Sequence, residues 1–448
     1  MSIGILALVS FSADLKFLLL VLLGLTIILV TFIRVDLGLI LLILSMLLSP
    51  EIKVGEVTGR DIIIRLDDLL IVLVFLTWVA RLAIYKEISV FKSTILNKPI
   101  WIYVSCCVLL TLFGMVRGDV NVIKGLFYLL KYLEYFLIYF MVVNILQDKS
   151  QPKLYLIVLL ITAGIVCLYS AAHIGKVARI SAPFEGAGEP NTLGGYLIIM
   201  TGCATGLALY AKRMQERIGL IIFIGLALIC IGYTLSRCSY IALPFMYLAI
   251  LRFSEKRRGL LGALLLGVII FILFRPPVVT ERINYTFAAQ GEESRERKEI
   301  LGIPIDPSAN DRITSWREEI KNAWNRYPFY TLIGVGITGV GFIDGQYIKT
   351  YIELGLIGLI VFIYLLCQMY RVYLKAYRST TGYSKGLALG LMGAFIGICV
   401  HALTANSFMI IRIQEPLWFL TAMIVWEQEM NSKLPRQTSS ATTSMKGN

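Results

Sequence analysis

The sequence has few of the residues that metal sites and disulfide frameworks require. It contains two histidines, eight cysteines and no Cys-x-x-Cys pair, and every cysteine falls inside or beside an apolar run. Cysteines in such positions are expected to be buried, reduced and structural. We therefore expect no disulfide framework, no zinc site and no cofactor.

Long polar segments are also lacking. Nothing between the apolar runs exceeds about 70 residues, so no separate soluble domain is expected. The first 33 residues have no basic start followed by a small-residue cleavage site, which favours a retained first helix over a removed signal peptide. The glycines at 334–341 are not followed by Gly-Lys-Ser/Thr, which argues against a nucleotide-binding P-loop.

Hydrophobic residues are abundant, at 57% of the 448 residues. This composition predicts an all-α, polytopic integral membrane protein with about 12–14 transmembrane helices. The runs long enough to span lie near 15–33, 35–49, 66–85, 99–116, 125–146, 153–172, 191–210, 217–234, 238–253, 259–275, 346–368, 386–405 and 413–427.

Basic residues gather in three short loops, so the net charge of +13 predicts membrane orientation and no nucleic-acid partner. Placing these loops inside places 173–190, 276–345 and 403–412 outside. The predicted organisation is transmembrane helices over 1–275, an outer loop over 276–345, further spans over 346–430 and a disordered cytoplasmic tail over 431–448. The three clusters are Lys212, Arg213 and Arg217; Arg252, Lys256, Arg257 and Arg258; and Arg371, Lys375 and Arg378.

The outer loop carries an amphipathic pattern. Its apolar residues recur at steps of three and four, which predicts one face of a helix that ends before Pro328. A glycine-rich turn follows, and Asp344-Gly345-Gln346-Tyr347 opens the next apolar run. The residues of the apolar face are Ile313, Trp316, Ile320, Trp324 and Tyr327.

Four arginines stand on the predicted outer side: Arg179, Arg237, Arg312 and Arg317. A guanidinium forms forked hydrogen bonds with phosphate oxygens and stays charged, so these residues are candidates for binding lipid phosphate. The alternative is that each anchors the chain at the head groups. Arg237 lies in a tight outer hairpin against the positive-inside trend, which favours a functional role for it.

Polar residues nearby allow more than one interpretation. The segment 183–191 is either only a flexible loop, with Asn191 as the cap of the next helix, or it also supplies Glu185 and Glu189 as candidate bases for a sugar hydroxyl. Asp344 either orients or deprotonates an acceptor hydroxyl, or it caps the helix that follows. Tyr347 lies close by on the same face, with Tyr351 one turn further on.

Other charged residues favour structural roles. The spacings of Lys349–Glu353 and Lys131–Glu134 are typical of ion pairs, and the second pair is interpreted as structural rather than as a proton relay. His401 and His173 are interpreted as hydrogen-bonded packing residues.

Four segments in the C-terminal 270 residues resemble the O-antigen ligase/polymerase superfamily of bacterial polysaccharide assembly. They are ARISAPFEGAGEPNTLGGYL, TLSRCSYIAL, DRITSWREEI…YPFYTLIGVG and DGQYIKTYIELGLIGL, in the order that the family shows. Ligases of the family have a histidine where the outer loop returns to the membrane. This sequence has Asp344 there, which favours the polymerase branch.

The resemblance implies a helical membrane fold of the GT-C type and inverting glycosyl transfer between undecaprenyl-diphosphate-linked glycans at the periplasmic face of the inner membrane. The implied partners are the glycan donor, the acceptor, membrane lipids and a chain-length regulator. Arg179, Arg237 and Arg312 would face the diphosphate, with Arg317 beside them. Asp344 would be the base or orienting group, and Trp316, Tyr347 and Tyr351 would stack on sugars.

Two other functions fit part of this pattern. The nearer one is a ligase that transfers the glycan to a lipid A-core or other acceptor. A flippase or exporter of lipid-linked glycans would also need arginines that bind phosphate. A transporter, however, predicts charge across the midplane and repeated halves, whereas the polar residues here concentrate on one side.

Overall fold

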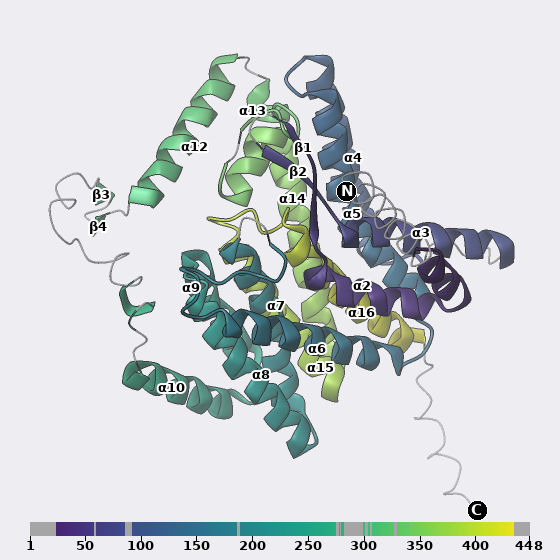
Figure 1. Cartoon of the computed structure of the whole chain (residues 1–448), viewed down its shortest axis with the longest axis vertical. Helices are drawn as coiled ribbons and strands as arrows, with labels where there is room; N and C mark the ends of the chain where they lie inside the picture. Colours follow the sequence, from purple (N-terminus) through teal and green to yellow (C-terminus); the bar gives the residue numbers. More distant parts are fainter. Residues whose placement is uncertain are drawn as a thin grey trace, which may run out of the picture.

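The computed structural model describes residues 24–57, 60–85, 92–185, 189–274, 277, 279–281, 299–300, 303–304, 307–326, 329–341 and 343–433. It is an assembly of helices with two short β-hairpins, so the all-α fold class is confirmed (Figure 1). The hairpins pair β1 (Glu51–Val57) with β2 (Arg60–Arg65) and β3 (Glu299–Ile300) with β4 (Ile303–Pro304). The helices are α2 (Val35–Leu48), α3 (Leu66–Tyr85), α4 (Asn97–Val116), α5 (Val122–Ile145), α6 (Gln151–Ala172), α7 (Pro190–Tyr210), α8 (Met214–Tyr233), α9 (Arg237–Phe253), α10 (Arg257–Phe274), α12 (Pro307–Arg326), α13 (Tyr330–Ile333), α14 (Gln346–Ser379), α15 (Gly382–His401) and α16 (Ile411–Lys433).

Seven helices in the described part of the chain are long and apolar enough to cross a membrane, namely α4, α5, α6, α7, α8, α14 and α15. This confirms a polytopic membrane protein, although the number is below the 12–14 spans predicted. Other predicted spans are short or charged. α2 has 14 residues, about 21 Å of helix against a hydrocarbon core of about 30 Å. α16 carries Arg412, Gln414 and Glu415 in its first turns.

Helix α7 lies at the centre of the bundle, with 89% of its spanning window buried. It packs closely on α15 through glycines. A Cβ atom built on Gly206 would lie 2.2 Å from the carbonyl oxygen of Gly386, and one on Gly390 would lie 2.4 Å from that of Gly202. Small residues at such crossings let helix backbones approach, which is how membrane helices gain packing energy without a hydrophobic driving force.

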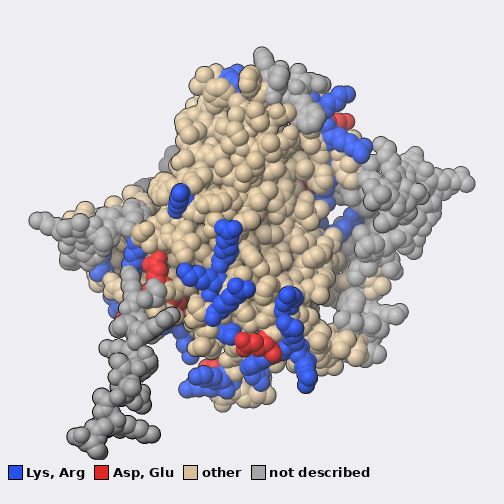
Figure 2. Space-filling view, turned by 180° about the vertical axis from the view of Figure 1, so that it is seen from behind, with Lys and Arg blue, Asp and Glu red and all other residues tan. Residues whose placement is uncertain are grey.

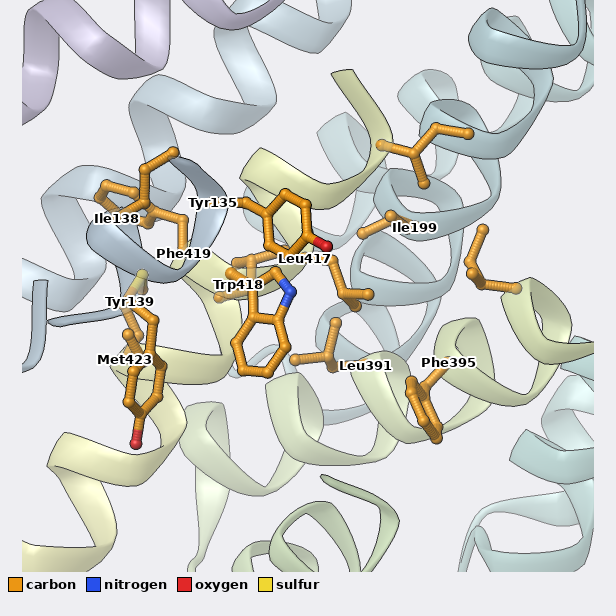
Figure 3. Close-up of a cluster of buried hydrophobic side chains, with 14 of the residues drawn as sticks. Tyr135, Ile138, Tyr139, Ile199, Leu391, Phe395, Leu417, Trp418, Phe419 and Met423 are labelled. Atoms are coloured by element: carbon orange, nitrogen blue, oxygen red, sulfur yellow. The ribbon is translucent and has the colours of Figure 1, made fainter. Parts of the chain in front are cut away.

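An aromatic cluster fills the core between α5, α7, α15 and α16 (Figure 3). The ring of Trp418 lies 4.8 Å from that of Phe136 and 5.6 Å from that of Tyr139, both edge-on. Edge-to-face contacts of this kind suit the charge distribution of aromatic rings. The cluster fixes α16 against α5 and so sets where the first turns of α16 lie.

The two ends of the bundle differ in character. One end, here called the loop face, carries residues 173–185, 189, 234–237, 334–341, 343–345 and 402–410. These segments contact one another: the backbone N–H of Ile180 donates to Tyr233, and that of Gln346 donates to Ala402.

The opposite end, here called the basic face, carries the three basic clusters predicted to lie on one side. Lys256 donates to the carbonyl of Leu209, and Lys385 pairs with Glu255 at 2.6 Å. Figure 2 shows Lys and Arg side chains gathered toward the lower end of the molecule, away from the end where α13 lies in Figure 1.

Helix α14 is longer than the predicted span 346–368 and is broken near its start. Gly355 has φ +65°, a conformation that favours glycine. A Cβ atom there would lie 2.2 Å from the carbonyl oxygen of Leu332. The break frees carbonyls of the first half of α14, and the preceding loop uses them: Val335 N–H donates to Ile352, and Gly336 N–H donates to Glu353.

Candidate functional site

The amphipathic helix predicted in the outer loop is present as α12, which ends at Arg326, just before Pro328. Its residues Trp316 and Ile320 pack against a small apolar cluster that includes Tyr330 and Ile352. The apolar face predicted from the sequence therefore docks α12 onto α13 and the first half of α14. The side chains of Trp324 and Tyr327 lie outside the described residues.

Arg312 and Asp344 meet where α12 contacts the end of the loop. Arg312 Nε lies 3.0 Å from Asp344 Oδ2, and Trp316 Nε1 donates to the backbone oxygen of Asp344 at 2.6 Å. Both charged side chains are a little under one-third exposed. Asp344 does not cap α14, which was one of its two predicted roles. The N-cap of α14 is Gly345, and the carboxylate serves Arg312 instead.

Gly345 is required by the close approach of three segments. Its φ is +98°, and an added Cβ would lie 2.9 Å from the oxygen of Leu403 and 3.0 Å from the Trp316 ring. The 402–410 loop adds a further link, because Asn406 Nδ2 donates to the oxygen of Ile343 at 2.8 Å. The start of α14 is thus held from α12 on one side and from the 402–410 loop on the other.

Arg179 and Arg237 lie at the corner between α8 and α9. Arg179 Nε donates to the oxygen of Thr234 at 3.0 Å, and its Nη2 donates to that of Leu235 at 3.3 Å. Arg237 is the first residue of α9 and is half-buried. The N-terminus of a helix presents unpaired N–H groups and a partial positive charge, both of which favour anions. The corner therefore combines two guanidinium groups with a helix N-terminus.

A chain of buried polar side chains, here called the polar chain, runs from this corner to the 402–410 loop. Ser236 donates to Asn191 Oδ1 at 2.8 Å, and Ser239 donates to Ser236 at 2.9 Å. The imidazole of His401 then bridges Ser239 (Nε2, 3.2 Å) and Ser407 (Nδ1, 2.7 Å). His401 is wholly buried, as its interpretation as a packing histidine predicted.

Asn191 does not cap α7, because that helix begins one residue earlier, at Pro190, with Glu189 at the N-cap. Its side chain instead joins the polar chain through Ser236. The carboxylate of Glu189 accepts from the hydroxyl of Thr192 at 3.0 Å. Both residues therefore order the start of α7 next to Arg237.

Arg412 is a site residue that the sequence reasoning missed. It is 1% exposed, and its Nη1 lies 3.0 Å from Glu185 Oε1. Its Nη2 lies 3.6 Å from Glu51 Oε1 and donates to the oxygen of Ser49 at 3.3 Å. A lone arginine in the apolar run MIIRIQEPLWF was the available signal. Charged residues in such positions are costly and point to a specific partner.

The structure also contradicts the expectation that Glu185 is a base for a sugar hydroxyl. Its side chain is 4% exposed, and its Oε2 accepts the backbone N–H groups of Ala182 and Glu189. It is therefore not open to a sugar hydroxyl, and its partner is Arg412. Burial raises the pKa of Glu185 to about 7, although the guanidinium of Arg412 acts in the opposite direction.

The remaining predicted residues make few polar contacts with the four arginines in the described structure. Arg317 is exposed on α12, the helix that also carries Arg312. Tyr347 donates to the oxygen of Cys399 at 2.9 Å and packs toward Phe362, which gives it a place in the core. Tyr351 is half-buried beside the apolar cluster under α12.

Charged pairs within the helices agree with their structural interpretation. Lys349 lies 3.9 Å from Glu353. Lys131 pairs with Glu134 at 3.8 Å and also with Asp68. Across the described ranges, no group of three or more His, Cys, Asp or Glu side chains is placed to hold a metal ion.

Comparison with known proteins gives one family. Residues 220–363 match the family model described as O-antigen ligase, which covers less than half of the chain. No curated protein matches the chain. The family match begins within α8, includes α9, α10, α12 and α13, and ends within α14. It confirms the superfamily resemblance inferred from the motifs, and it does not separate polymerases from ligases.

Proposed function

We propose that this member of the O-antigen ligase/polymerase superfamily is a membrane glycosyltransferase that polymerises undecaprenyl-diphosphate-linked oligosaccharide repeat units at the periplasmic face of the bacterial inner membrane. One observation carries the proposal. Arg179 and Arg237 lie on the loop face, and Arg312 of α12 pairs there with Asp344, so three different elements bring arginines to this face, which lies opposite the basic face. The positive-inside rule assigns the basic face to the cytoplasm and so assigns the loop face to the periplasm.

The reaction suits this arrangement. A sugar hydroxyl of one lipid-linked repeat unit attacks the anomeric carbon of another glycan with inversion. The new glycosidic bond forms as the bond to the diphosphate breaks. Negative charge then grows on the leaving diphosphate. Guanidinium groups fixed in advance stabilise this charge more in the transition state than in the ground state. Arg179 and Arg237, with the N-terminus of α9, are the proposed diphosphate contacts.

Asp344 is the residue proposed to act on the acceptor sugar. Arg312 and Trp316 fix its position, so that its carboxylate orients the attacking hydroxyl and accepts its proton. We assign Arg312 to positioning Asp344 and to the charge around the diphosphate, with the exposed Arg317 as a further contact. The described contacts of Tyr347 and Tyr351 suit packing; sugar stacking is proposed only for Trp316, at the junction of α12 and the start of α14.

The ligase alternative follows from the description of the matched family. Two features favour the polymerase. Asp344-Gly345-Gln346 stands at the return of the loop, where ligases of the family have a histidine. The nearby His401 is wholly buried between two serines, so it has no access to an acceptor.

The test uses the full chain in lipid with the undecaprenyl-diphosphate repeat unit of its host as the sole substrate. We expect a ladder of longer glycans on a gel, lost in Arg237→Ala and strongly reduced in Asp344→Asn. Arg371→Ala, at an exposed position on the basic face, is the matched control and should retain the ladder.

Two other outcomes would replace the proposal. Product that forms only after a core oligosaccharide or other acceptor is added would identify a ligase. Absence of both products, together with movement of repeat units across liposome membranes, would identify a flippase or exporter.

A further inference from the structure

A large cavity opens on the basic face, at the opposite end of the bundle from the candidate site. Its volume is about 1020 Å³, and it lies between α6, the turn from α7 to α8, the turn from α14 to α15, and the end of α16. Pockets for small ligands usually range from about 300 to 1,000 Å³. This cavity is therefore large enough for a ligand with a long hydrocarbon part.

The rim of the cavity is positively charged. Lys149, Lys153, Lys212 and Arg213 line it, against two carboxylates, Glu216 and Glu427. Only one of these cations has a described ion pair with a carboxylate of the rim, Lys153 with Glu216 at 3.8 Å. Tyr383 also lines the cavity, and its hydroxyl is buried behind the lining with no hydrogen-bond partner in the described structure. The rim thus offers several donors to one anionic group.

The wall of the cavity is apolar and continues along two membrane-spanning helices. Leu156 and Ile161 of α6 face Leu220 and Phe223 of α8 across it. Ile161 is 55% exposed, which is ordinary for a side chain that faces hydrocarbon. Donors at one end and a hydrocarbon wall at the other match a lipid with a phosphate head group.

We propose that this cavity binds one anionic phospholipid from the basic-face leaflet. Its phosphate is held by Lys149, Lys212 and Arg213, and an acyl chain lies along Ile157 and Phe223. Charge complementarity favours an anionic over a zwitterionic phospholipid. A zwitterionic head group would place its own cation next to the four basic side chains. The bound lipid lies between α6, α8 and α16, which all contribute to the lining. This site is independent of the proposed polymerase activity.

The first test is native mass spectrometry of the full chain in detergent, with phosphatidylglycerol added in steps and phosphatidylcholine as the zwitterionic comparison. We expect one tightly retained phosphatidylglycerol. Each basic residue near an anionic head group contributes about a fivefold change in affinity. Lys149→Ala with Lys212→Ala should therefore weaken binding about 25-fold. Arg371→Ala with Lys375→Ala, exposed on the same face but outside the cavity, is the control and should bind as the wild type does.

A second pair of variants tests the volume of the cavity instead of its charge. Gly219 lines the cavity, and a Cβ there would meet nothing within 4 Å. Gly225 lies on the same helix outside the cavity and is equally open. We expect Gly219→Trp to lose the retained lipid and Gly225→Trp to keep it, with both variants folded. Equal retention of phosphatidylcholine, or retention of undecaprenyl phosphate in preference to phosphatidylglycerol, would overturn the proposal. So would unchanged binding in Gly219→Trp.

Discussion

The loop face and the basic face both carry arginines, but the two ends hold them differently. On the loop face, Arg179 is held by two backbone carbonyls, Arg312 by Asp344, and Arg412 by Glu185. On the basic face, Arg217 and Arg257 also donate to backbone carbonyls, but Arg371 and Lys375, near the end of α14, are exposed. Charge that sets orientation in a membrane needs only the correct side. Charge that acts on a reacting group also needs a fixed position.

The largest effect expected from this difference is on stability. Arg412→Ala leaves the carboxylates of Glu185 and Glu51 without their buried cation, which should lower the free energy of unfolding by about 3–5 kcal/mol. Thermal unfolding in detergent, followed by tryptophan fluorescence, measures the change. Arg371→Ala should change stability by less than about 0.5 kcal/mol. If the two variants were equally stable, the comparison between the faces would fail.

On activity, Arg237→Ala should lower the polymerisation rate by about 10²–10³-fold, the usual cost of losing one fixed donor to developing charge. Initial rates of ladder formation give the value. Arg237→Lys keeps the charge but loses the forked geometry, so it should recover only part of the rate. A fall of less than about threefold in Arg237→Ala would remove this residue from the diphosphate site.

Two glycines with positive φ allow the backbones of the two faces to be compared. Gly355, under the loop face, has no room for a Cβ, whereas at Gly382 on the basic face a Cβ meets nothing within 4 Å. Gly382→Ala should cost about 1–2 kcal/mol for the left-handed conformation alone. Gly355→Ala adds a clash with Leu332 and should cost about 3 kcal/mol or more. Unfolding midpoints of the two variants test the difference, and equal costs would contradict it.

The protonation of Glu185 predicts how the stability of the loop face depends on pH. Its pKa is raised from 4.5 to about 7 by burial, so the folded state favours the protonated carboxyl. The stability that this preference adds is fully present below about pH 4.5 and is lost as the pH rises through about 7. Relative to Glu185→Gln, the wild type should lose about 2 kcal/mol between pH 5 and pH 8. Parallel stability curves for the two proteins would show that Glu185 does not titrate in this range.

The smallest expected effect is the coupling between Arg312 and Asp344. Each side chain keeps more than a quarter of its surface exposed, so solvent screens the pair. A double-mutant cycle with Arg312→Ala and Asp344→Asn should give a coupling of about 1 kcal/mol or less in stability. In polymerisation rate, the two changes should be strongly non-additive, because Arg312 acts partly by positioning Asp344. Additive effects on rate would assign the two residues to separate roles.

The local features of the fold were predictable from the sequence. The face of α12 follows from apolar spacing, its end follows from Pro328, and the Lys349–Glu353 pair follows from a separation of four residues. The three basic clusters indicated which loops share one end of the bundle. Each of these features depends on residues close together in the chain.

Contacts between distant segments were not predictable in this way. Arg412 is in α16 and Glu185 is in the loop before α7, whereas His401 ends α15 and Ser239 is in α9. Only the packing of these helices brings the two residues of each pair together. The break at Gly355 was missed because it falls inside an apolar run that looks like one continuous span. A glycine in such a run carries no local signal of its φ angle.

The broken start of α14 also bears on which sequence changes this part of the chain can accept. The loop before α14 is attached to it through backbone N–H and carbonyl groups, at Val335 with Ile352 and at Gly336 with Glu353. Bonds of this kind do not depend on which side chains the loop carries. An exposed position of the loop such as Gly341, where an added Cβ would meet nothing within 4 Å, can therefore change while the helix that follows keeps its place. The surface of the loop and the architecture beneath it can vary separately at this position.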